Sequence, residues 1–555
     1  MKRNDNGRDL AQVLGYHERT KHHLHSYARS LGYMDWKNQP NPFRIFQGAP
    51  VIALNRDLPV GEVRYDDSYR PTGQDPQPLG RQSISQLFFD SLALSAWKEV
   101  QGNRWSLRCN PSSGNLHPTE CYLIAPAAQG FVDSPAVYHY SPLLHALEQR
   151  AQFSRDDWQN LVQGLPPESF LLALTSIHWR ESWKYGERAY RYCQHDAGHA
   201  IAALAFSASA LGWKICLLDS VTDDQIAQLV RIEDQTGIES EHPDCLIVVM
   251  PATASLSPDT SPNWCPSADV LERIARSPRC GEPNRLSESH HEWPIIEDVA
   301  AACVRLQAPE KSFWSRPPGS RSTPMMRPTR ARRMFRQRRS AVDLDGRTNI
   351  DVYTFYRMMR RVSPSNGEVP FAALPWAPAV NLVLFVHRVQ GLTPGVYVLV
   401  RDRNHRNALE EAFRDQFVWR RPASCPADVD LYLLEAIDCR QQAKSVSCDQ
   451  DIAADGAFAV AMIAEFEPSL ERWGPWFYRH LHWEAGAIGQ VLYLEAEAAV
   501  IRATGIGCFF DDAVHDLLGI QDHQFQTIYH FTLGGPVDDP RLKTIDPYFH
   551  LDVNT

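Results

Sequence analysis

The sequence is organised around Asn110-Pro111-Ser112-Ser113-Gly114-Asn115-Leu116-His117-Pro118, a stretch that precedes the apolar run Cys121-Tyr122-Leu123-Ile124. Pro111 fixes a turn, the two serines offer hydroxyl and amide donors, and Gly114 lets a flat or phosphorylated ligand approach the backbone. A rigid, donor-rich loop before a core strand suits a planar cofactor, although similar residues also form ordinary helix-capping turns. The rest of the chain decides between these two interpretations.

Length and composition indicate an ordinary globular protein. The chain has 555 residues, of which 44% are hydrophobic and 22% charged, enough for roughly two to four domains. A net charge of -10 argues against general nucleic-acid binding, which needs a basic surface. The 12 cysteines show neither a C-x-x-C pair nor zinc-ligand spacing, which is typical of reduced cytoplasmic thiols. No signal-peptide core and no membrane-spanning run is found, so we expect a cytoplasmic protein without membrane contact.

Two segments show no obvious core pattern. Residues 1–75 form an N-terminal arm with four histidines between Tyr16 and His25. A solvated helix or docking surface explains them better than a metal site, because no cysteine or carboxylate completes a ligand set. Residues 256–335 form a Pro-containing linker, and the basic run from Lys311 to Arg339 contains no acidic residue. We expect the linker to be solvated or only locally ordered.

The remaining residues, 76–255 and 336–555, alternate between helical and strand patterns. In the first stretch, apolar spacing predicts a helix over Ser83–Trp97 and a long helix over Glu187–Leu211. In the second, it predicts a long helix over His482–Thr504 and a strand over Ile506–Phe510. The two stretches therefore have the same general organisation.

The second stretch is an internal repeat of the first. Tyr190-Arg191 followed by Asp196-Ala197-Gly198 recurs as Tyr478-Arg479 followed by Glu484-Ala485-Gly486, an offset of 288 residues (478 − 190). Further matches equate Ala210-Leu211-Gly212 with Ala503-Thr504-Gly505, Ser83 with Ser340 and Tyr138 with Tyr397, at offsets of 293, 257 and 259 (503 − 210, 340 − 83 and 397 − 138). Order and spacing are kept, so the chain is a fused tandem of one domain.

These motifs together resemble the nitroreductase superfamily. The resemblance rests on Arg-x-Ser at a helix start, Pro-Ser-Ser-Gly-x-x-x-Pro before a strand, and a long helix ending in Ala-Leu-Gly. More narrowly, Lys184-Tyr185-Gly186-Glu187-Arg188 and Gly505-Ile506-Gly507-Cys508-Phe509-Phe510-Asp511-Asp512 are similar to tandem SagB-type (ThcOx-like) dehydrogenases. The resemblance implies FMN and an α+β fold, in which each copy has a central, mostly antiparallel sheet flanked by helices. The two copies would form an intramolecular pseudo-dimer.

In that superfamily a flavin lies between two copies, so the resemblance implies two composite sites. The two sites do not carry the same set of binding residues. The residues of the first site are Pro111, Ser112, Ser113 and Gly114 from one copy and Arg338, Arg339, Ser340, Arg541 and Lys543 from the other. Guanidinium, ammonium and hydroxyl donors suit a phosphate dianion. The second site would join Arg81 and Ser83 to the loop Leu374–Val380, which lacks the serines and the glycine. We therefore expect one intact FMN site per chain and one decayed site.

The same resemblance points to residues that act on the reacting atoms. Gly505, Ile506 and Gly507 would offer unobstructed backbone amides to N5 and N1 of the reduced flavin. Lys184 and Tyr185 are the candidate catalytic residues, because a Lys-Tyr pair at this motif is associated with catalysis in SagB-type azoline oxidases. Dehydrogenation sends a hydride to flavin N5 and a proton to a base.

Alternatives remain for these residues. A surface lysine beside a core tyrosine would give the same pattern at Lys184-Tyr185, and the second copy has Arg472-Trp473 there. Cys109 and Cys508 lie near the proposed flavin and are interpreted as small packing residues. We expect no metal site.

Three functions follow. The first is an FMN-dependent oxidoreductase of SagB type that dehydrogenates a heterocycle, azoline to azole, in a modified peptide or related small metabolite. The second is an NAD(P)H-dependent nitro- or quinone reductase. No Gly-x-Gly-x-x-Gly follows a strand, so a nicotinamide would have to enter the flavin cleft itself. The third is a non-catalytic module that binds a peptide or partner protein. A biosynthetic partner enzyme is a further expectation, and the protein would be a monomeric pseudo-dimer or a homodimer.

Overall fold

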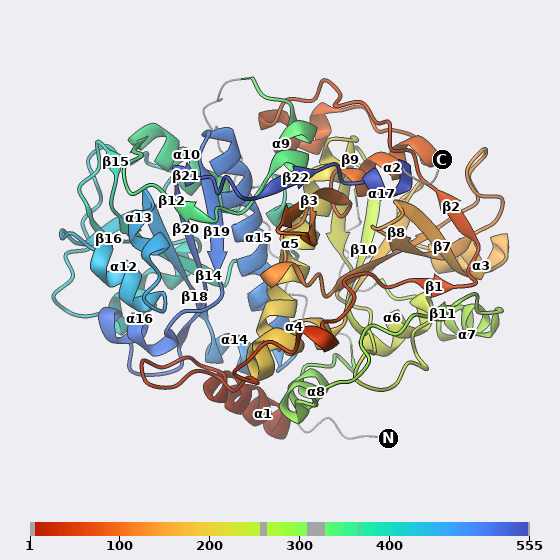
Figure 1. Cartoon of the computed structure of the whole chain (residues 1–555), viewed down its shortest axis with the longest axis horizontal. Coiled ribbons are helices and arrows are strands. Elements are labelled where there is room, and N and C mark those ends of the chain that lie inside the picture. The colour runs from red at the N-terminus through yellow and green to blue at the C-terminus, as the bar shows by residue number, and fades with distance from the viewer. Residues whose placement is uncertain (1–5, 256–263, 308–327, 366, 553–555) are drawn as a thin grey trace.

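Two long helices, α5 (Ala189–Ser209) and α15 (Phe477–Ala498), cross at the centre of the molecule (Figure 1). The computed structural model describes residues 6–255, 264–307, 328–365 and 367–552. The helices meet at Gly198 and Gly486, where a Cβ on Gly198 would lie 2.7 Å from Trp483 Cα. A Cβ on Gly486 would lie 2.9 Å from Gly198 Cα. Glycine is needed at both positions because the two backbones touch.

Each half of the molecule contains one antiparallel sheet, and the strand order is the same in both. The first sheet has the order β2-β7-β6-β5-β8-β10-β9, and the second β17-β16-β14-β18-β20-β19. Apart from the edge strand β2, the strands correspond one to one. Tyr138 lies opposite Leu123 and Tyr397 opposite Leu384, so these two repeat residues occupy equivalent registers. The chain is therefore a tandem of two α+β domains that form an internal pseudo-dimer.

The strands of the first sheet are β2 (Val51–Ala53), β5 (Thr119–Ala125), β6 (Ala136–Ser141), β7 (Ala146–Gln152), β8 (Phe170–Ser176), β9 (Trp213–Leu217) and β10 (His242–Pro251). Those of the second are β14 (Val380–Val386), β16 (Gly395–Leu399), β17 (Leu431–Glu435), β18 (Phe458–Glu465), β19 (Arg502–Ile506) and β20 (Phe525–Gly534). Short pairs join β1 (Phe46–Gln47) to β11 (Glu282–Pro283), β12 (Asp343–Leu344) to β21 (Pro536–Val537), and β13 (Ile350–Asp351) to β15 (Val389–Gln390).

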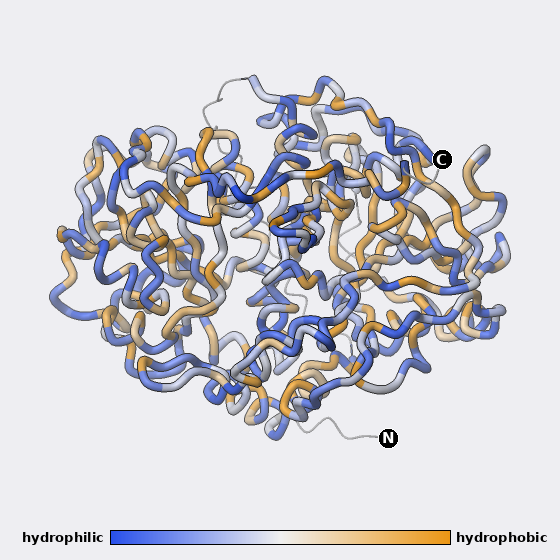
Figure 2. The backbone as a smooth tube through the Cα atoms, viewed as in Figure 1, coloured by the Kyte–Doolittle hydropathy of each residue, from blue (hydrophilic) through white to orange (hydrophobic). Residues whose placement is uncertain are grey.

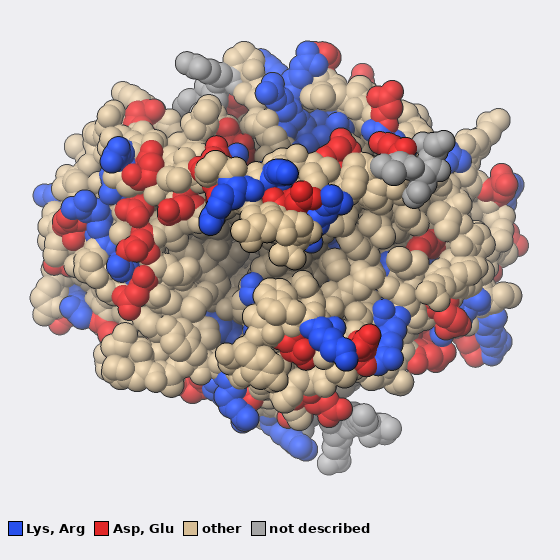
Figure 3. Space-filling view, in the orientation of Figure 1, with Lys and Arg blue, Asp and Glu red and all other residues tan. Residues whose placement is uncertain are grey.

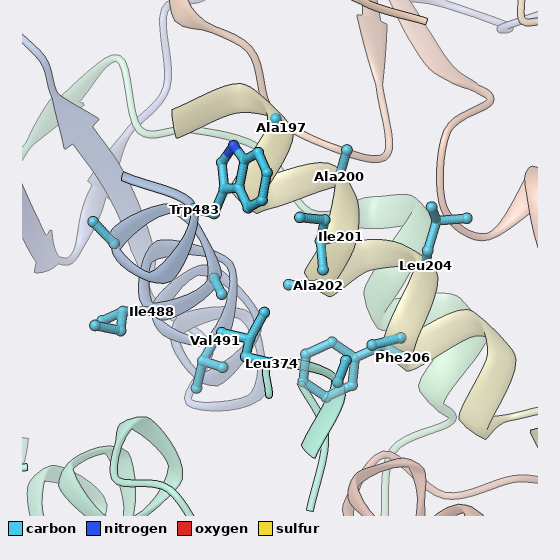
Figure 4. Packing of buried hydrophobic residues seen from close by; sticks show 14 of the residues in the cluster. Ala197, Ala200, Ile201, Ala202, Leu204, Phe206, Leu374, Trp483, Ile488 and Val491 are labelled. Carbon is cyan, nitrogen blue, oxygen red and sulfur yellow. The ribbon is translucent and has the colours of Figure 1, made fainter. Parts of the chain in front are cut away.

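Helices cover the sheets of both halves, and the central strands are accordingly apolar throughout. Every residue of β5, β8 and β14 is buried, and Figure 2 shows the hydrophobic segments concentrated within the sheets. Around the central crossing, Ile201, Leu204 and Phe206 of α5 pack into the same cluster as Ile488 and Val491 of α15 (Figure 4). The core is therefore continuous between the two domains.

The remaining helices of the first half are α1 (Asn6–Arg19), α2 (Arg81–Phe89), α3 (Arg155–Leu161), α4 (His178–Tyr185), α6 (Asp223–Val230), α7 (Ala268–Arg276) and α8 (Pro294–Ala302). Those of the second are α9 (Ala331–Gln337), α10 (Val352–Val362), α11 (Arg406–Ala412), α12 (Arg440–Val446), α13 (Asp451–Asp455), α14 (Glu467–Trp473), α16 (Asp511–Leu518) and α17 (Phe549–Asp552). Within residues 6–255, 264–307, 328–365 and 367–552, no helix combines the length and apolar character needed to cross a membrane.

The two segments expected to lack a core differ from that prediction. In the N-terminal arm, Tyr16 is buried against Tyr190 and Tyr478, and His17 and His22 are also buried rather than solvated. In the segment after the first domain, α7 packs its apolar face on the first sheet. Both segments bury apolar residues at particular positions, such as Val270, Leu271 and Ile274 on one face of α7, and composition alone does not reveal such spacing. Residues 256–263 and 308–327, which include the start of the basic run, lie outside the described residues.

The C-terminal segment crosses from the second half to the first (Figure 1). Its strand β22 (Lys543–Ile545) pairs with β3 (Leu94–Val100), which also pairs with β4 (Asn103–Arg108). The helix predicted over Ser83–Trp97 therefore ends early, at Phe89, because its last predicted residues form β3. Apolar residues alone do not distinguish a helix end from a buried strand.

Strand registers also correct two equivalences of the repeat. Strand β19 begins at Arg502, not at the predicted Ile506, and its equivalent β9 begins at Trp213. Strand pairing connects Tyr138 through Leu123, Leu172 and Ile247 to Leu217, and it connects Tyr397 through Leu384, Val460 and Phe531 to Gly505. The offset there is 288 (505 − 217) instead of 293. Ser83 lies inside α2, whereas Ser340 follows the end of α9, so these two serines are not equivalent. Lys214 is therefore the structural counterpart of Arg502.

Candidate functional site

A cavity of about 680 Å³ lies between the two halves. The predicted residues that line it are Pro111, Ser112, Ser113, Gly114, Tyr185, Arg338, Arg339, Ser340, Gly505, Ile506 and Gly507. Figure 3 shows a hollow near the middle of this face, with Lys and Arg side chains along one edge. The structure thus brings together residues from both copies of the repeat, as the sequence predicts.

The loop from Pro111 to Pro118 has an unusual backbone that a carboxylate from α5 stabilises. Gly114, Asn115 and His117 all have positive φ angles, of 61°, 57° and 53°. The backbone N–H of Ser113 donates to the Asp196 carboxylate at 3.1 Å, and its Oγ donates at 3.3 Å. Burial raises the pKa of Asp196 to about 7, although hydrogen bonds from the two serines of the loop lower it. Asp196 therefore fixes the loop and titrates near neutrality.

Lys184 and Tyr185 end helix α4 directly beside this loop. A Cβ on Gly114 would lie 2.8 Å from Tyr185 Oη and 3.0 Å from Lys184 Nζ. Burial, followed by the nearby Glu181, raises the pKa of Tyr185, so its phenol stays protonated. Both side-chain ends therefore meet the loop that forms the cavity wall, and Gly114 leaves the space for them.

Arg338 links the second copy to the first through two of its three guanidinium nitrogens. Its Nε donates to the carbonyl of Cys109 and its Nη2 to the carbonyl of Arg108, both at 3.1 Å. Its Nη1 is buried and has no hydrogen-bond partner among the residues that the structure describes. A buried guanidinium nitrogen that lines a cavity without a partner fits an anionic ligand.

Four further cations line the cavity with Arg338, and three of them were missed in the sequence. Arg339 was predicted, whereas Lys98, Arg108 and Arg502 were not. Burial, then Arg339 and Arg502, lowers the pKa of Lys98, which shows that these charges lie close together. Arg502 was missed because its strand was placed four residues too late. A phosphate dianion would stabilise such a cluster of like charges.

Ser340 and the Gly505–Gly507 turn are positioned by tyrosines. The Tyr493 hydroxyl bonds Ser340 Oγ at 2.8 Å and accepts from the Gly505 N–H at 3.0 Å. The Gly505 amide is thus engaged within the protein, which corrects the prediction that it is free for a flavin. Side chains at Gly505 and Gly507 would collide with Tyr529 and Tyr192. Tyrosine packing therefore explains both glycines.

Arg541 and Lys543 do not line the cavity, contrary to the sequence prediction. Arg541 is 78% exposed and pairs with Asp539 at 2.7 Å. Lys543 is also exposed, 3.9 Å from Glu99. Because neighbouring residues of a strand face opposite sides, Thr544 of β22 faces the cavity where Lys543 was expected. There its hydroxyl accepts a hydrogen bond from Lys98 Nζ at 2.7 Å.

The equivalent position in the second copy is filled by protein. The Trp376 indole donates to Glu484 at 3.3 Å and packs 4.5 Å from the His480 ring. The space left beside it is about 10 Å³. Neither Arg81, which donates to the carbonyl of Ala53, nor Ser83, which is bonded to Pro78, lines this space. The geometry agrees with the prediction of a decayed second site.

Two carboxylate–histidine groups lie away from the cavity. They are His178 with His242 and Glu297, and Glu18 with His23 and Asp512, whose ligand atoms lie within 4.8 Å of one another in each group. Neither group shares a residue with the cavity lining. They carry no part of the site described above.

Comparison with known protein families identifies the family of this chain. The model of the nitroreductase family matches residues 76–249 and 391–535. The chain belongs to the nitroreductase family. Both copies of the repeat contribute to this match, which confirms the predicted superfamily, and the fold is that of nitroreductase-family oxidoreductases. A comparison with curated protein sequences found no match.

Solved structures extend the likeness over the whole tandem. A protein of Anabaena variabilis described as a nitroreductase has a TM-score of 0.67 at 21% identity, covering 95% of this chain and 99% of its own. A Ralstonia eutropha protein described similarly reaches 0.27 at 16% identity, covering 39% and 95%. The Escherichia coli microcin synthetase McbBCD complex with truncated pro-MccB17 reaches 0.26 at 20% identity, covering 44% and 92%. At these identities, the first likeness shows a shared fold, and the other two carry no argument.

Proposed function

We propose that this protein is an FMN-dependent oxidoreductase of SagB type, which dehydrogenates a heterocycle, azoline to azole, in a modified peptide or related small metabolite. The observation that carries the proposal is the cavity of about 680 Å³ between the copies. Its lining combines five cations, the Pro-Ser-Ser-Gly loop and Tyr185, and Lys184 lies beside the loop at Gly114 without lining the cavity itself. Nitroreductase-family membership supports the oxidoreductase class.

The residues of the cavity fit FMN. Arg338 offers a buried, unpartnered nitrogen, and Arg339, Arg502 and Lys98 supply further positive charge for a phosphate. Gly114 has a positive φ of 61°, and a side chain there would meet Tyr185 and Lys184, so glycine lets this pair lie against the loop. Since the two copies of one chain provide both halves of this cavity, the proposed site needs no second subunit.

The side chains beside the loop divide the chemistry of dehydrogenation. FMN, when bound, supplies an acceptor for the hydride that leaves the azoline ring. Lys184 accepts the proton that leaves with the hydride. Tyr185, which burial keeps protonated, donates a hydrogen bond and orients the heterocycle.

An azoline-containing peptide tests this proposal. We expect the FMN-loaded protein to remove two hydrogens from the peptide, which mass spectrometry detects, and Lys184→Ala to slow turnover by at least about 100-fold with FMN content unchanged. Lys37→Ala, at a lysine whose side chain is 79% exposed and pairs with Glu288 on the surface, is the matched control. Equal turnover by Lys184→Ala and the wild type would contradict the proposed role.

Two other outcomes would point to the alternative functions. Rapid reduction of the bound flavin by NADH or NADPH, without any azoline consumption, would indicate a nitro- or quinone reductase. Failure to bind FMN at all would indicate a binding module for a peptide or partner enzyme.

A further inference from the structure

Two cysteine side chains touch at the edge of the cavity. Cys508 follows the Gly505–Gly507 turn and lines the cavity. Cys448 lies opposite, with its Sγ 2.8 Å from Cys508 Sγ. Both residues are half-buried and carry free thiols. A disulfide has an S–S distance of about 2.05 Å, so a small shift would join these two sulfurs.

The loop that carries Cys448 has a rare backbone conformation. Cys448 and Asp449 both have positive φ angles, 55° and 53°, which side-chain-bearing residues adopt uncommonly. Gln450 Nε2 ties the loop to the facing segment by donating to the carbonyls of Ser447 and Cys508 at 2.8 and 2.9 Å. The strained loop thus holds one sulfur against the other, and such strain concentrates at functional sites.

His22 from the N-terminal arm completes the environment of Cys508. The His22 Nδ1 accepts a hydrogen bond from the Ala28 N–H at 2.9 Å, so the neutral ring carries its proton on Nε2. Hydrogen bonds with Cys448 and then with His22 lower the pKa of the Cys508 thiol to about 5. Cys109, by contrast, is fully buried, and burial raises its pKa to about 12. The packing role assigned to both cysteines from the sequence therefore fits Cys109 and not Cys508.

We propose that Cys448 and Cys508 form a redox-active dithiol–disulfide pair that reacts with disulfides entering the cavity. Cys508 is the attacking thiolate, because it lines the cavity and has His22 beside it. Cys448 is the resolving thiol, because its sulfur touches Cys508. This activity goes beyond the proposed function and does not need FMN.

The exchange balances with a small disulfide RS–SR as the oxidant. The Cys508 thiolate attacks one sulfur of RS–SR, the S–S bond breaks, and one thiolate RS⁻ leaves and takes up a proton. Cys448 then loses its proton and attacks Cys508 Sγ, which forms the Cys448–Cys508 bond and releases the second thiol. Two cysteine thiols are oxidised, and one disulfide is reduced to two thiols.

The test is made on the full-length wild-type protein without added FMN. The protein is equilibrated with oxidised and reduced glutathione, the free thiols are alkylated, and the peptides are identified by mass spectrometry. We expect a linked Cys448–Cys508 peptide that forms with oxidised glutathione and disappears with excess reduced glutathione. The exposed Cys265 is the internal control for solvent access. We expect Cys508 to react at least tenfold faster than Cys265.

Single variants separate attack from resolution. Cys448→Ser should trap a stable glutathione adduct on Cys508, since no resolving thiol remains. Cys508→Ser should leave Cys448 unmodified under the same conditions. The proposal is overturned if the wild-type protein forms no linked peptide, or if its Cys508 reacts no faster than Cys265. Because these readouts are peptide masses, a failure of the proposed FMN chemistry would leave them unchanged.

Discussion

The two copies hold the same loop in the same place but differ in what lies beside it. In the first copy, Ser113 donates to Asp196 of α5, and a cavity of about 680 Å³ lies next to the loop. In the second, the Ala379 N–H donates to Glu484 of α15 at 2.9 Å, and Trp376 leaves about 10 Å³. The carboxylate of the long helix therefore serves the fold in both copies.

The residues around the loop, and not the shared motif, set the copies apart. Arg502 lines the cavity of the intact site, whereas its counterpart Lys214 donates to the carbonyl of Ala254 and does not line the space beside Trp376. Both copies thus keep a cation at this strand position, but the cation of Lys214 is bound by a carbonyl of its own domain. A repeat motif is evidence for the fold, and each site has to be argued from the side chains that face it.

The largest expected effect comes from removing the Trp376 side chain, which fills the loop position of the second copy. Trp376 is 5% exposed, so Trp376→Ala should lower the free energy of unfolding by about 3–5 kcal/mol, measured by urea denaturation. The exposed Trp36 provides a control, and Trp36→Ala should change stability by less than about 0.5 kcal/mol. FMN stoichiometry should stay the same, because the loop of the second copy still lacks the serines and the glycine of the first. A second bound FMN in Trp376→Ala would break the comparison.

The helix crossing that both copies share gives the next effect. Gly198→Ala should cost about 3 kcal/mol of unfolding free energy, because the new Cβ meets the Trp483 backbone. Gly15→Ala in α1 is the matched control, since a Cβ on Gly15 would meet no neighbouring atom within 4 Å, and alanine there should be neutral or stabilising. Thermal unfolding compares the two, and equal melting temperatures would contradict the close crossing.

A smaller effect separates the cations of the cavity from those outside it. Arg338→Ala should weaken FMN binding by about 2 kcal/mol, roughly 10- to 100-fold, because it removes a charge-assisted donor. Arg541→Ala should leave the FMN affinity unchanged, because Arg541 is exposed and paired with Asp539. Fluorescence titration with FMN measures both affinities. An equal loss in both variants would contradict the cavity assignment.

The smallest effect concerns the loop of the first copy. Ser113→Ala should cost about 1 kcal/mol of stability, since it removes the hydroxyl that donates to Asp196. This bond lowers the Asp196 pKa from what burial alone would give, so the variant has a still higher folded-state pKa. A raised carboxyl pKa costs stability as pH rises from the unfolded value toward the folded one. Above about pH 7 the wild type loses no further stability, whereas the variant continues to lose it. The difference between their free energies of unfolding therefore grows from about pH 7 upward.

A double variant checks the origin of that pH dependence. In an Asp196→Asn background, Ser113→Ala should have a pH-independent effect, because asparagine does not ionise. Urea unfolding between about pH 6 and 9 measures the four proteins of this cycle. If the effect of Ser113→Ala still grew with pH in the Asp196→Asn background, the ionising group would have to lie elsewhere.

Much of the fold was predictable, because the residues that recur in the two copies are ones that the fold requires. Gly198 and Gly486 are forced by the helix crossing, and Asp196 and Glu484 both cap a loop, so the motif survives in both copies. Long helices and buried strands also have clear apolar patterns. Boundaries were less predictable, as β3 shows, because a short apolar run fits a helix end and a strand equally well.

The loop residues of the candidate site were predicted from the sequence, whereas several of its charged residues were not. The Pro111–Gly114 loop and Arg338–Ser340 line the cavity as expected. Lys98, Arg108 and Arg502 were missed, because their side chains reach the cavity only through strand pairing and register. Lys543 was wrong by one residue, which is enough to turn a strand side chain to the opposite face. Motif position was informative, whereas the direction of single side chains required the structure.

The most direct test of the central claim is the number of FMN molecules bound per chain at saturation. The visible absorption of the protein, together with released and quantified flavin, provides this number. We predict one FMN per chain, and we predict that Ser112→Ala from one copy and Arg338→Ala from the other both weaken that same site. Two FMN per chain would contradict the decayed second site, and none would contradict the flavin site itself.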